Sequence, residues 1–361
     1  MKIPYMDLRV QSKKKKKQLL LAVDRVLSHG RIILGPEVKQ FEDEIASICQ
    51  TKYAVGQGSG TDALYMALRS LDIGPGDEVI TTPLSWIATV NAITLCGAKP
   101  VFVDIREDMN INVGLIEDAI TEKTKAILPV HYTGRICDMV KISRIASEKS
   151  IFIVEDAAQA FGANIHGAMA GSFGEVSAFS MNAMKGLNSY GEAGAVVTNS
   201  EVLESKLRSL TYAGTINKED CHYPSLNARM DTIQAAMLLV NLEYLEAKIK
   251  RRQEIAYYYS DALYDVVTCP KEDDSSQVYY NYVIRTGKRD KLISYLNSRG
   301  VETKIHYPIL MPFHTAYRQF YSDCDIPLAK RIVSEIVSIP NHEDLTDSEV
   351  EYVADCIRAF G

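Results

Sequence analysis

The segment Ser59-Gly60-Thr61-Asp62 places small, hydroxyl and carboxyl side chains directly before a helical pattern that begins at Ala63-Leu64. Backbone N–H groups at the start of a helix attract an anion, and small hydroxyl side chains add further donors. These residues are therefore suited to hold a phosphate group. Serine, threonine and aspartate are also ordinary N-caps, so simple helix capping is the alternative interpretation.

Asp156 and Lys185 could supply acid–base and covalent chemistry. Asp156 ends the apolar run that starts at residue 151, and its carboxylate could cap the next helix or keep a cationic ring nitrogen protonated. Lys185 has apolar or small neighbours, namely Met181, Met184, Gly186 and Leu187. We expect loss of water around this lysine to lower its pKa and to expose the neutral amine that forms Schiff bases. The alternative is a surface lysine whose ammonium group reaches the solvent.

Trp86 is the only tryptophan in the chain. It could fill the core, as tryptophans commonly do, or it could form a flat wall against the ring of a cofactor. A phosphate cradle, an acid for a ring nitrogen, an aromatic wall and a Schiff-base lysine are together the parts that pyridoxal phosphate requires. The four segments therefore indicate a pyridoxal phosphate site.

The composition restricts the class of protein without indicating its chemistry. Of the 361 residues, 47% are hydrophobic and 24% are charged, which matches a soluble globular protein and excludes a disordered or collagen-like chain. No apolar run approaches the ~18–20 residues that cross a bilayer, so we expect no membrane partner. A net charge of −6 argues against general nucleic-acid binding. Seven cysteines without a CxxC pair indicate reduced thiols in the cytoplasm, and we expect no metal site.

Strand-like segments alternate with helix-length intervals from about residue 36 onward. These segments are rich in apolar and β-branched residues and cover 53–56, 77–81, 100–104, 126–130 and 151–156. Such alternation predicts an α/β fold with a mainly parallel sheet between two layers of helices. Ligands of such sheets bind beyond the carboxyl ends of the strands. Asp156 and the turn at 58–61 are both expected at such ends.

The alternation changes near residue 245, after which a smaller α+β pattern follows. We therefore predict a large domain over 1–245 and a small domain over 246–361. A strand is expected over 278–284. The last helix is expected to begin with a capping box formed by Thr346 and Glu349.

Five consecutive lysines occupy positions 13–17. They are interpreted as the solvated first turn of a helix that ends at His29-Gly30, because glycine suits the position after a helix. The alternative is a patch that binds phosphate or a membrane surface.

Several ordered motifs resemble one family of enzymes from end to end. They are Ile3-Pro4-Tyr5-Met6-Asp7-Leu8, Gly60-Thr61-Asp62-Ala63-Leu64, Gly74-Pro75-Gly76-Asp77-Glu78-Val79, Glu155-Asp156-Ala157-Ala158-Gln159-Ala160, Asn227-Ala228-Arg229-Met230 and Ile305-His306-Tyr307-Pro308. The chain is similar in these motifs to the DegT/DnrJ/EryC1/StrS sugar aminotransferases. The resemblance implies the fold type I architecture of pyridoxal phosphate transferases, with a seven-stranded type of sheet and a smaller C-terminal domain.

The resemblance also implies roles for individual residues. Lys185 matches the Schiff-base lysine and proton carrier, and Asp156 matches the acid beside the pyridine nitrogen. Other positions match contacts to the cofactor ring (Trp86 and Gln159) or to its phosphate (Ser59, Gly60, Thr61 and Ser180). Asn227 matches a phosphate contact from a second subunit, which implies a homodimer with shared active sites. Arg229, His306 and His314 match substrate-side positions, although packing alone is the alternative for the two histidines.

The implied reaction moves an amino group from L-glutamate to a keto- or aldehyde-sugar, with pyridoxamine phosphate as the intermediate form. A nucleotide-linked keto-deoxyhexose for polysaccharide, lipopolysaccharide or glycoside synthesis is the expected acceptor. The unusual segment Met181-Asn182-Ala183-Met184 before Lys185 keeps a free cyclitol or an eight-carbon sugar acid aldehyde open. A sugar dehydratase that uses pyridoxamine phosphate is disfavoured by Lys185, where such relatives carry histidine. A fold type I lyase is disfavoured by Trp86. A non-catalytic regulator on the same fold is a further alternative.

Overall fold

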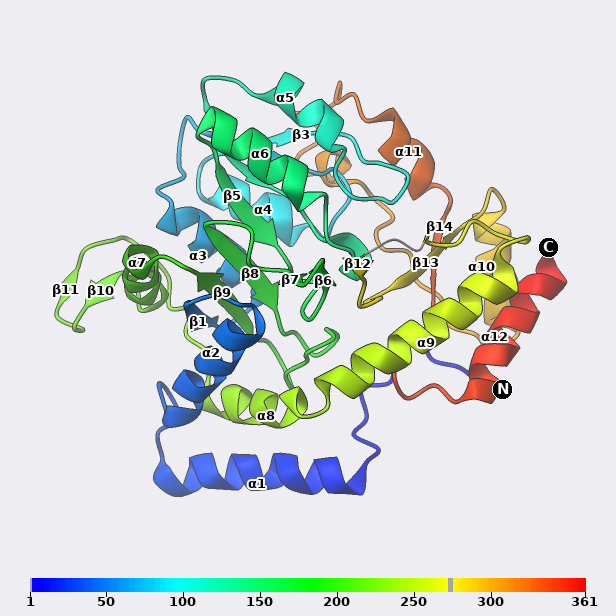
Figure 1. Cartoon of the computed structure of the whole chain (residues 1–361), viewed down its shortest axis with the longest axis horizontal. Coiled ribbons are helices and arrows are strands. Elements are labelled where there is room, and N and C mark those ends of the chain that lie inside the picture. Colours follow the sequence, from blue (N-terminus) through cyan, green and yellow to red (C-terminus); the bar gives the residue numbers. More distant parts are fainter. Residues whose placement is uncertain (1, 272–274) are drawn as a thin grey trace.

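The computed structural model describes residues 2–271 and 275–361 and centres on a seven-stranded sheet (Figure 1). The strands lie in the order β1-β9-β8-β5-β4-β2-β3. Strands β3, β2, β4, β5 and β8 pair in parallel, whereas β9 runs antiparallel to β8 and β1. The bounds are Tyr53–Gln57 (β1), Glu78–Thr81 (β2), Lys99–Phe102 (β3), Thr124–Leu128 (β4), Phe152–Asp156 (β5), Val176–Ser180 (β8) and Gly194–Thr198 (β9). The predicted α/β fold with a mainly parallel sheet is therefore confirmed.

Alternating side chains bury both faces of this sheet. In β2, Val79 belongs to one apolar core and the next residue, Ile80, belongs to the other. The core with Ile80 is completed by α2 (Pro36–Ile48), α6 (Met139–Lys149) and α8 (Thr232–Leu242). The opposite face is covered by α3 (Gly60–Ser70), α4 (Ala88–Leu95) and α7 (Glu201–Thr211). Burial on both faces explains why the strands are continuous apolar runs in the sequence.

The predicted strands of the large sheet are confirmed, with ends that differ by one or two residues, whereas β8 and β9 were not predicted. The strand predicted over 278–284 is wrong in its first half, because β13 covers Tyr282–Arg285 and pairs with β14 (Ile336–Ile339). Tyr279 has a φ of 45°, in the left-handed region, which interrupts an extended chain. The N–H group of Val278 instead donates to the carbonyl of Gly134, which lies in the loop after β4.

The C-terminal part of the chain forms a separate apolar core. Helices α9 (Leu245–Leu263), α10 (Arg289–Ser298) and α12 (Asp347–Phe360) surround the β13–β14 pair. The predicted capping box at the start of α12 is confirmed. Ile3 also packs into this core and pairs with Val301. The division of the chain at residue 245 stays a prediction, and the first residues contact the C-terminal core rather than the large sheet.

Short elements complete the described chain. They are α5 (Ile116–Ala119), α11 (Pro327–Val333), the β10 (Thr215–Ile216) and β11 (Asp220–Cys221) hairpin, a small sheet of β6 (Asn164–Ile165), β7 (Ala168–Met169) and β12 (Ser275–Ser276), and the 3-10 turns Val113–Leu115, Tyr132–Gly134 and Met311–Phe313. The β10–β11 hairpin projects away from the body of the molecule (Figure 1).

Helix α1 (Lys13–His29) contains the five lysines and packs along α8 (Figure 1). Ser12 caps its first turn, and Gly30 follows its last turn with a φ of 72°. The left-handed conformation suits glycine, so the predicted end at His29-Gly30 is confirmed. Across residues 2–271 and 275–361, no helix combines the length and the apolar character that crossing a membrane requires.

Candidate active site

A cavity of about 620 Å³ lies where the loops after β1, β2, β5 and β8 meet residues of the C-terminal region. The predicted site residues that line it are Ser59, Gly60, Thr61, Trp86, Asp156, Gln159, Ser180, Lys185 and His306. The loops meet because these strands run in the same direction and end at one edge of the sheet. The size is that of a pocket for a small ligand.

The start of α3 forms one wall of this cavity. The Ser59 hydroxyl accepts a hydrogen bond from the Asp62 N–H (3.0 Å) and donates to the Asp62 carboxylate (2.9 Å), so helix capping is confirmed for Ser59. A Cβ atom on Gly60 would lie 2.4 Å from Cβ of Ser180, so only glycine allows α3 to approach the end of β8 this closely. Capping and anion binding are compatible, because Gly60, Thr61 and Ser180 still face the cavity. Burial raises the pKa of Asp62, and its hydrogen bond with Ser59 opposes this rise.

Asp156 provides a buried carboxylate at the end of β5. Its Oδ2 accepts a hydrogen bond from the Thr89 hydroxyl (2.8 Å), and its Oδ1 accepts one from the Ala158 N–H (3.2 Å). The interpretation of Asp156 as a helix cap is wrong, because turns rather than a helix follow it. Burial raises the pKa of Asp156, while the Thr89 hydrogen bond opposes this rise. A cationic group in the cavity would therefore be stabilised by this carboxylate.

Lys185 lies on the loop between β8 and β9 and extends into the cavity. Hydrogen bonds from the Met181 N–H to the Ala193 carbonyl and from the Ser189 N–H to the Met181 carbonyl (both 2.8 Å) hold this loop. The ammonium of Lys185 lies 4.5 Å from the centre of the Tyr280 ring. This position favours the cavity interpretation over that of a lysine on the open surface.

Trp86 and Gln159 complete two further walls. Trp86 is 57% exposed and lines the cavity, so its interpretation as a core residue is wrong. Its ring centre lies 5.5 Å from that of Tyr307, and the two rings are inclined by 47°. Gln159 is buried, and its Oε1 accepts a hydrogen bond from the Thr133 N–H (2.8 Å). An aromatic face and a fixed amide thus border the same space.

His306 enters the cavity from the C-terminal region. Its Nδ1 lies 2.8 Å from the Ser338 hydroxyl, and its ring packs 5.5 Å from that of Tyr5. Burial, with the nearby charges of Lys185 and Lys304, lowers the pKa of His306 to about 4. The imidazole is therefore neutral at physiological pH and can serve as a neutral hydrogen-bonding group.

Three predicted site residues lie away from this cavity of their own chain. Asn227 is exposed and accepts a hydrogen bond from Arg229 Nε (2.8 Å), and the Arg229 guanidinium stacks 4.3 Å from the centre of the Tyr212 ring. Arg229 lines a different hollow of about 560 Å³ beside the β10–β11 hairpin. His314 follows the turn Met311–Phe313, where its carbonyl accepts hydrogen bonds from the Tyr317 and Arg318 N–H groups.

Several lining residues were missed by the sequence analysis. They include Ser85, Thr89, Asn182, Glu192, Tyr280 and Tyr307. Thr89 lies three residues after Trp86 in the first turn of α4, and this spacing could have indicated a polar group beside the same wall. Asn182 donates to Glu192 (2.6 Å) across the loop that carries Lys185. Tyr280 gives no sequence signal, because it reaches Lys185 only through the packing of the C-terminal region.

Pyridoxal phosphate fits the chemistry of this set of groups. The described hydrogen bonds to the buried Asp156 carboxylate come from neutral groups, which leaves it available to a protonated ring nitrogen. The close approach of α3 to Ser180 requires a glycine at position 60. It brings together N–H and hydroxyl groups that could donate hydrogen bonds to a phosphate. The amine of Lys185 reaches the same cavity. Asp156, Gly60, Thr61, Ser180 and Lys185 are thus the residues that would hold the cofactor.

Comparison with known proteins identifies the family of this chain. The DegT/DnrJ/EryC1/StrS aminotransferase family matches residues 13–358. The chain is 36% identical to a pleiotropic regulatory protein of Geobacillus stearothermophilus over 100% of this chain and 99% of that protein. It is 38% identical to the dTDP-3-amino-3,6-dideoxy-alpha-D-galactopyranose transaminase of Aneurinibacillus thermoaerophilus, with 99% of each covered.

Solved structures extend the similarity to three dimensions. The crystal structure of S. venezuelae DesV in complex with a reaction intermediate superposes with a TM-score of 0.97 at 37% identity, covering 99% of this chain and 98% of that one. Structures similar to this chain include pyridoxal phosphate and pyridoxamine phosphate forms. The chain therefore belongs to the DegT/DnrJ/EryC1/StrS aminotransferase family and is a pyridoxal-phosphate-dependent aminotransferase.

Proposed function

We propose that this protein transfers an amino group from L-glutamate to a nucleotide-linked keto-deoxyhexose. The observation that carries the proposal is the meeting of Lys185, Asp156 and the start of α3 in one cavity, opposite His306 and Tyr307. The relatives support the acceptor class, because they include proteins named as dTDP-sugar and UDP-sugar aminotransferases. The catalytic residue is Lys185.

Each residue of the cavity has a defined task in this reaction. When bound, pyridoxal phosphate supplies a carbon that carries the amino group and a ring that withdraws electrons from the reacting carbon. Asp156 holds a proton at the ring nitrogen, since an ionised carboxylate favours the cation beside it. The Lys185 amine would remove the proton from the α-carbon of the donor and carry it to the carbon that the cofactor supplies for the amino group. Trp86 fixes the plane of the ring, and the start of α3 binds the phosphate.

The acceptor is tested by incubating the holoenzyme with L-glutamate and a panel of keto-sugars, with and without a nucleotide, and following by mass spectrometry which sugar gains an amino group. Parallel detection of 2-oxoglutarate identifies glutamate as the donor. If only free cyclitols or a sugar acid aldehyde gain an amino group, the proposal of a nucleotide-linked acceptor is wrong. Tight cofactor binding without any amine product would favour the dehydratase, and absence of cofactor binding would favour the regulator.

The role of Lys185 is tested by Lys185→Ala, with Lys250→Ala on the exposed face of α9 as the matched control. We expect Lys185→Ala to retain cofactor and to lose about 10³-fold or more in kcat, because both the covalent link and the proton carrier are removed. Lys250→Ala should retain wild-type turnover. A small primary amine added to the Lys185→Ala protein should restore part of the proton transfer. Normal turnover by Lys185→Ala would contradict the assignment.

We further propose that the working enzyme is a homodimer in which Asn227 completes the site of the partner. Asn227 is exposed in its own chain, Leu226 beside it is 53% exposed, and the β10–β11 hairpin next to them projects from the molecule (Figure 1). An exposed apolar residue beside an exposed amide on a projecting loop suits insertion into a second copy.

Mixing two inactive variants tests the shared site. In a dimer of Lys185→Ala with Asn227→Ala, one site contains both mutations and the other contains Lys185 with an intact Asn227 from its partner. If Asn227→Ala is itself strongly impaired, an equal mixture should recover about one quarter of wild-type activity, since half of the dimers are mixed and one site in each is intact. Activity that does not exceed the sum of the separate variants would contradict the shared site.

A further inference from the structure

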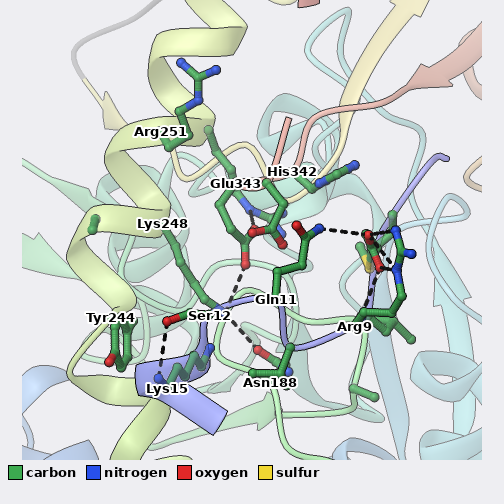
Figure 2. Close-up of a pocket in the computed structure, with 18 of the residues that line it drawn as sticks. Arg9, Gln11, Ser12, Lys15, Asn188, Tyr244, Lys248, Arg251, His342 and Glu343 are labelled. Atoms are coloured by element: carbon green, nitrogen blue, oxygen red, sulfur yellow. Dashed lines mark hydrogen bonds and ion pairs between the residues drawn. The ribbon is translucent and has the colours of Figure 1, made fainter. Parts of the chain in front are cut away.

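A second cavity of about 280 Å³ borders the Lys185 loop and lies between the N-terminal segment, α9 and the residues near His342 (Figure 2). It shares Lys185 with the active-site cavity but has its own walls. One wall is the first turn of α1, which places part of the five-lysine run beside this space.

Only one lysine of the run faces this cavity. Lys15 is partly buried, whereas the other lysines at 13–17 are exposed. Its ammonium lies 5.2 Å from the centre of the Tyr244 ring, and both residues line the cavity (Figure 2). The helical period therefore exposes four of the five lysines to solvent and turns Lys15 toward the cavity. The prediction that the whole run is solvated is therefore wrong for Lys15.

The positive charges around the cavity exceed the negative ones. Lys248 Nζ lies 3.0 Å from Glu343 Oε1, and Arg252 Nη2 lies 2.9 Å from Glu343 Oε2, so two cations share one carboxylate. Within the described residues, the Lys15 ammonium has no carboxylate within ion-pair distance. Arg9 is compensated by Asp7. Lys15 thus adds a positive charge that the cavity does not neutralise.

The titration of Lys15 agrees with this excess of positive charge. Burial, followed by the neighbouring charge of Lys248, lowers the pKa of Lys15 to about 8. The pKa of Glu343 is held well below its usual range, because Arg252 and Lys248 outweigh the effect of burial. Two carboxylates of the cavity, Glu343 and Asp344, act to raise the pKa of Lys15, but they do not outweigh burial and Lys248. An anion placed between Lys15 and Lys248 would relieve their repulsion.

We propose that this cavity binds a phosphate-type oxyanion between Lys15 and Lys248. Two ammonium groups that share one space suit a group with a charge near −2 and several acceptor oxygens. A neutral donor is available at its edge, since the Ser12 hydroxyl also lines the cavity, whereas Asn188 Oδ1 accepts a hydrogen bond from Lys248 Nζ (2.9 Å; Figure 2). An apolar ligand or a cation would leave the positive charges uncompensated. This proposal is independent of which sugar accepts the amino group, because an oxyanion can bind without turnover.

Calorimetric titration of the holoenzyme with inorganic phosphate tests this site while the cofactor occupies the phosphate cradle at α3. We expect saturable binding that weakens with added salt, and a loss of about tenfold or more in affinity for Lys15→Gln, because a charge-assisted contact is removed. Lys14→Gln is the matched control, since it removes the same charge from an exposed position of the same run and should bind phosphate as the wild type does. Lys15→Arg should retain binding, which excludes misfolding as the cause.

A competition arm distinguishes two sources of the oxyanion. If dTDP displaces phosphate from the wild type, the site holds the diphosphate of a nucleotide sugar, and Lys15→Gln should raise KM for that sugar without lowering kcat. If dTDP leaves phosphate bound, the site holds free phosphate. Absence of phosphate binding by the wild-type holoenzyme, or equal affinities of the wild type, Lys14→Gln and Lys15→Gln, would overturn the proposal, and neither result bears on the aminotransferase assay.

Discussion

Replacing Thr89 with valine tests how the buried Asp156 carboxylate is kept ionised. The change preserves the shape of the side chain and removes the hydroxyl that donates to Asp156 Oδ2 at 2.8 Å. Burial alone raises the pKa of Asp156, and the Thr89 hydrogen bond opposes this rise because it stabilises the ionised form. The variant should therefore have an Asp156 with a still higher pKa.

The size of the effect follows from the burial of both partners. A hydrogen bond to a charged group contributes about 1.5–3 kcal/mol, and one pKa unit corresponds to about 1.4 kcal/mol, so the pKa of Asp156 should rise by about one to two units. Asp156 must be ionised to keep the ring nitrogen protonated. The acid limb of the kcat/KM profile should therefore move to higher pH by the same amount, while the activity at alkaline pH is retained.

The assay is the aminotransfer rate measured across pH with the holoenzyme. Thr94→Val on the same helix is the matched control, since Thr94 bonds to the Val90 carbonyl and to Tyr317 rather than to Asp156. Ser85 lies 2.9 Å from the Thr89 hydroxyl and could replace it as a donor, so the double variant Thr89→Val with Ser85→Ala should show the larger shift. An acid limb identical to that of the wild type in both folded variants would refute this reasoning.

Three further predictions follow from buried or cavity-lining contacts. Gly60→Ala should weaken cofactor binding by about tenfold or more in an absorbance titration, since its Cβ would lie 2.4 Å from that of Ser180 and would displace the phosphate donors; unchanged affinity would contradict the close approach. Glu155→Gln should lower the free energy of unfolding by about 3–5 kcal/mol in urea, because buried Glu155 accepts hydrogen bonds from several donors and pairs with His131 at 2.9 Å. Burial opposes ionisation of Glu155, but these partners lower its pKa, so the contribution is present at neutral pH and the difference from the wild type should narrow as pH falls below the ordinary glutamate value. The emission of Trp86, the sole tryptophan, should be quenched on adding pyridoxal phosphate; emission that does not respond would place the ring away from this wall.

Five strands of the large sheet were predicted because their signals are local, whereas β8 and β9 were not. A strand buried on both faces needs a continuous apolar run, and such runs are visible without any knowledge of tertiary contacts. The placement of Asp156 and of Ser59 at the same edge followed from the parallel direction of these strands. The error over 278–284 arises from a tertiary contact. Val278 is buried against the loop that contains Gly134 rather than within a sheet. Burial in either setting selects the same apolar residue types, so the sequence does not distinguish them.

The sequence by itself determined the fold class, the family and the residues that could hold pyridoxal phosphate, because these depend on residue types at fixed spacing within single elements. Tertiary structure decided which side chains meet. Thr89 reaches Asp156, Tyr280 lies against Lys185, and Lys15 turns into a cavity beside Lys248. Such contacts join elements far apart in the chain, and their geometry follows from how helices and sheets pack.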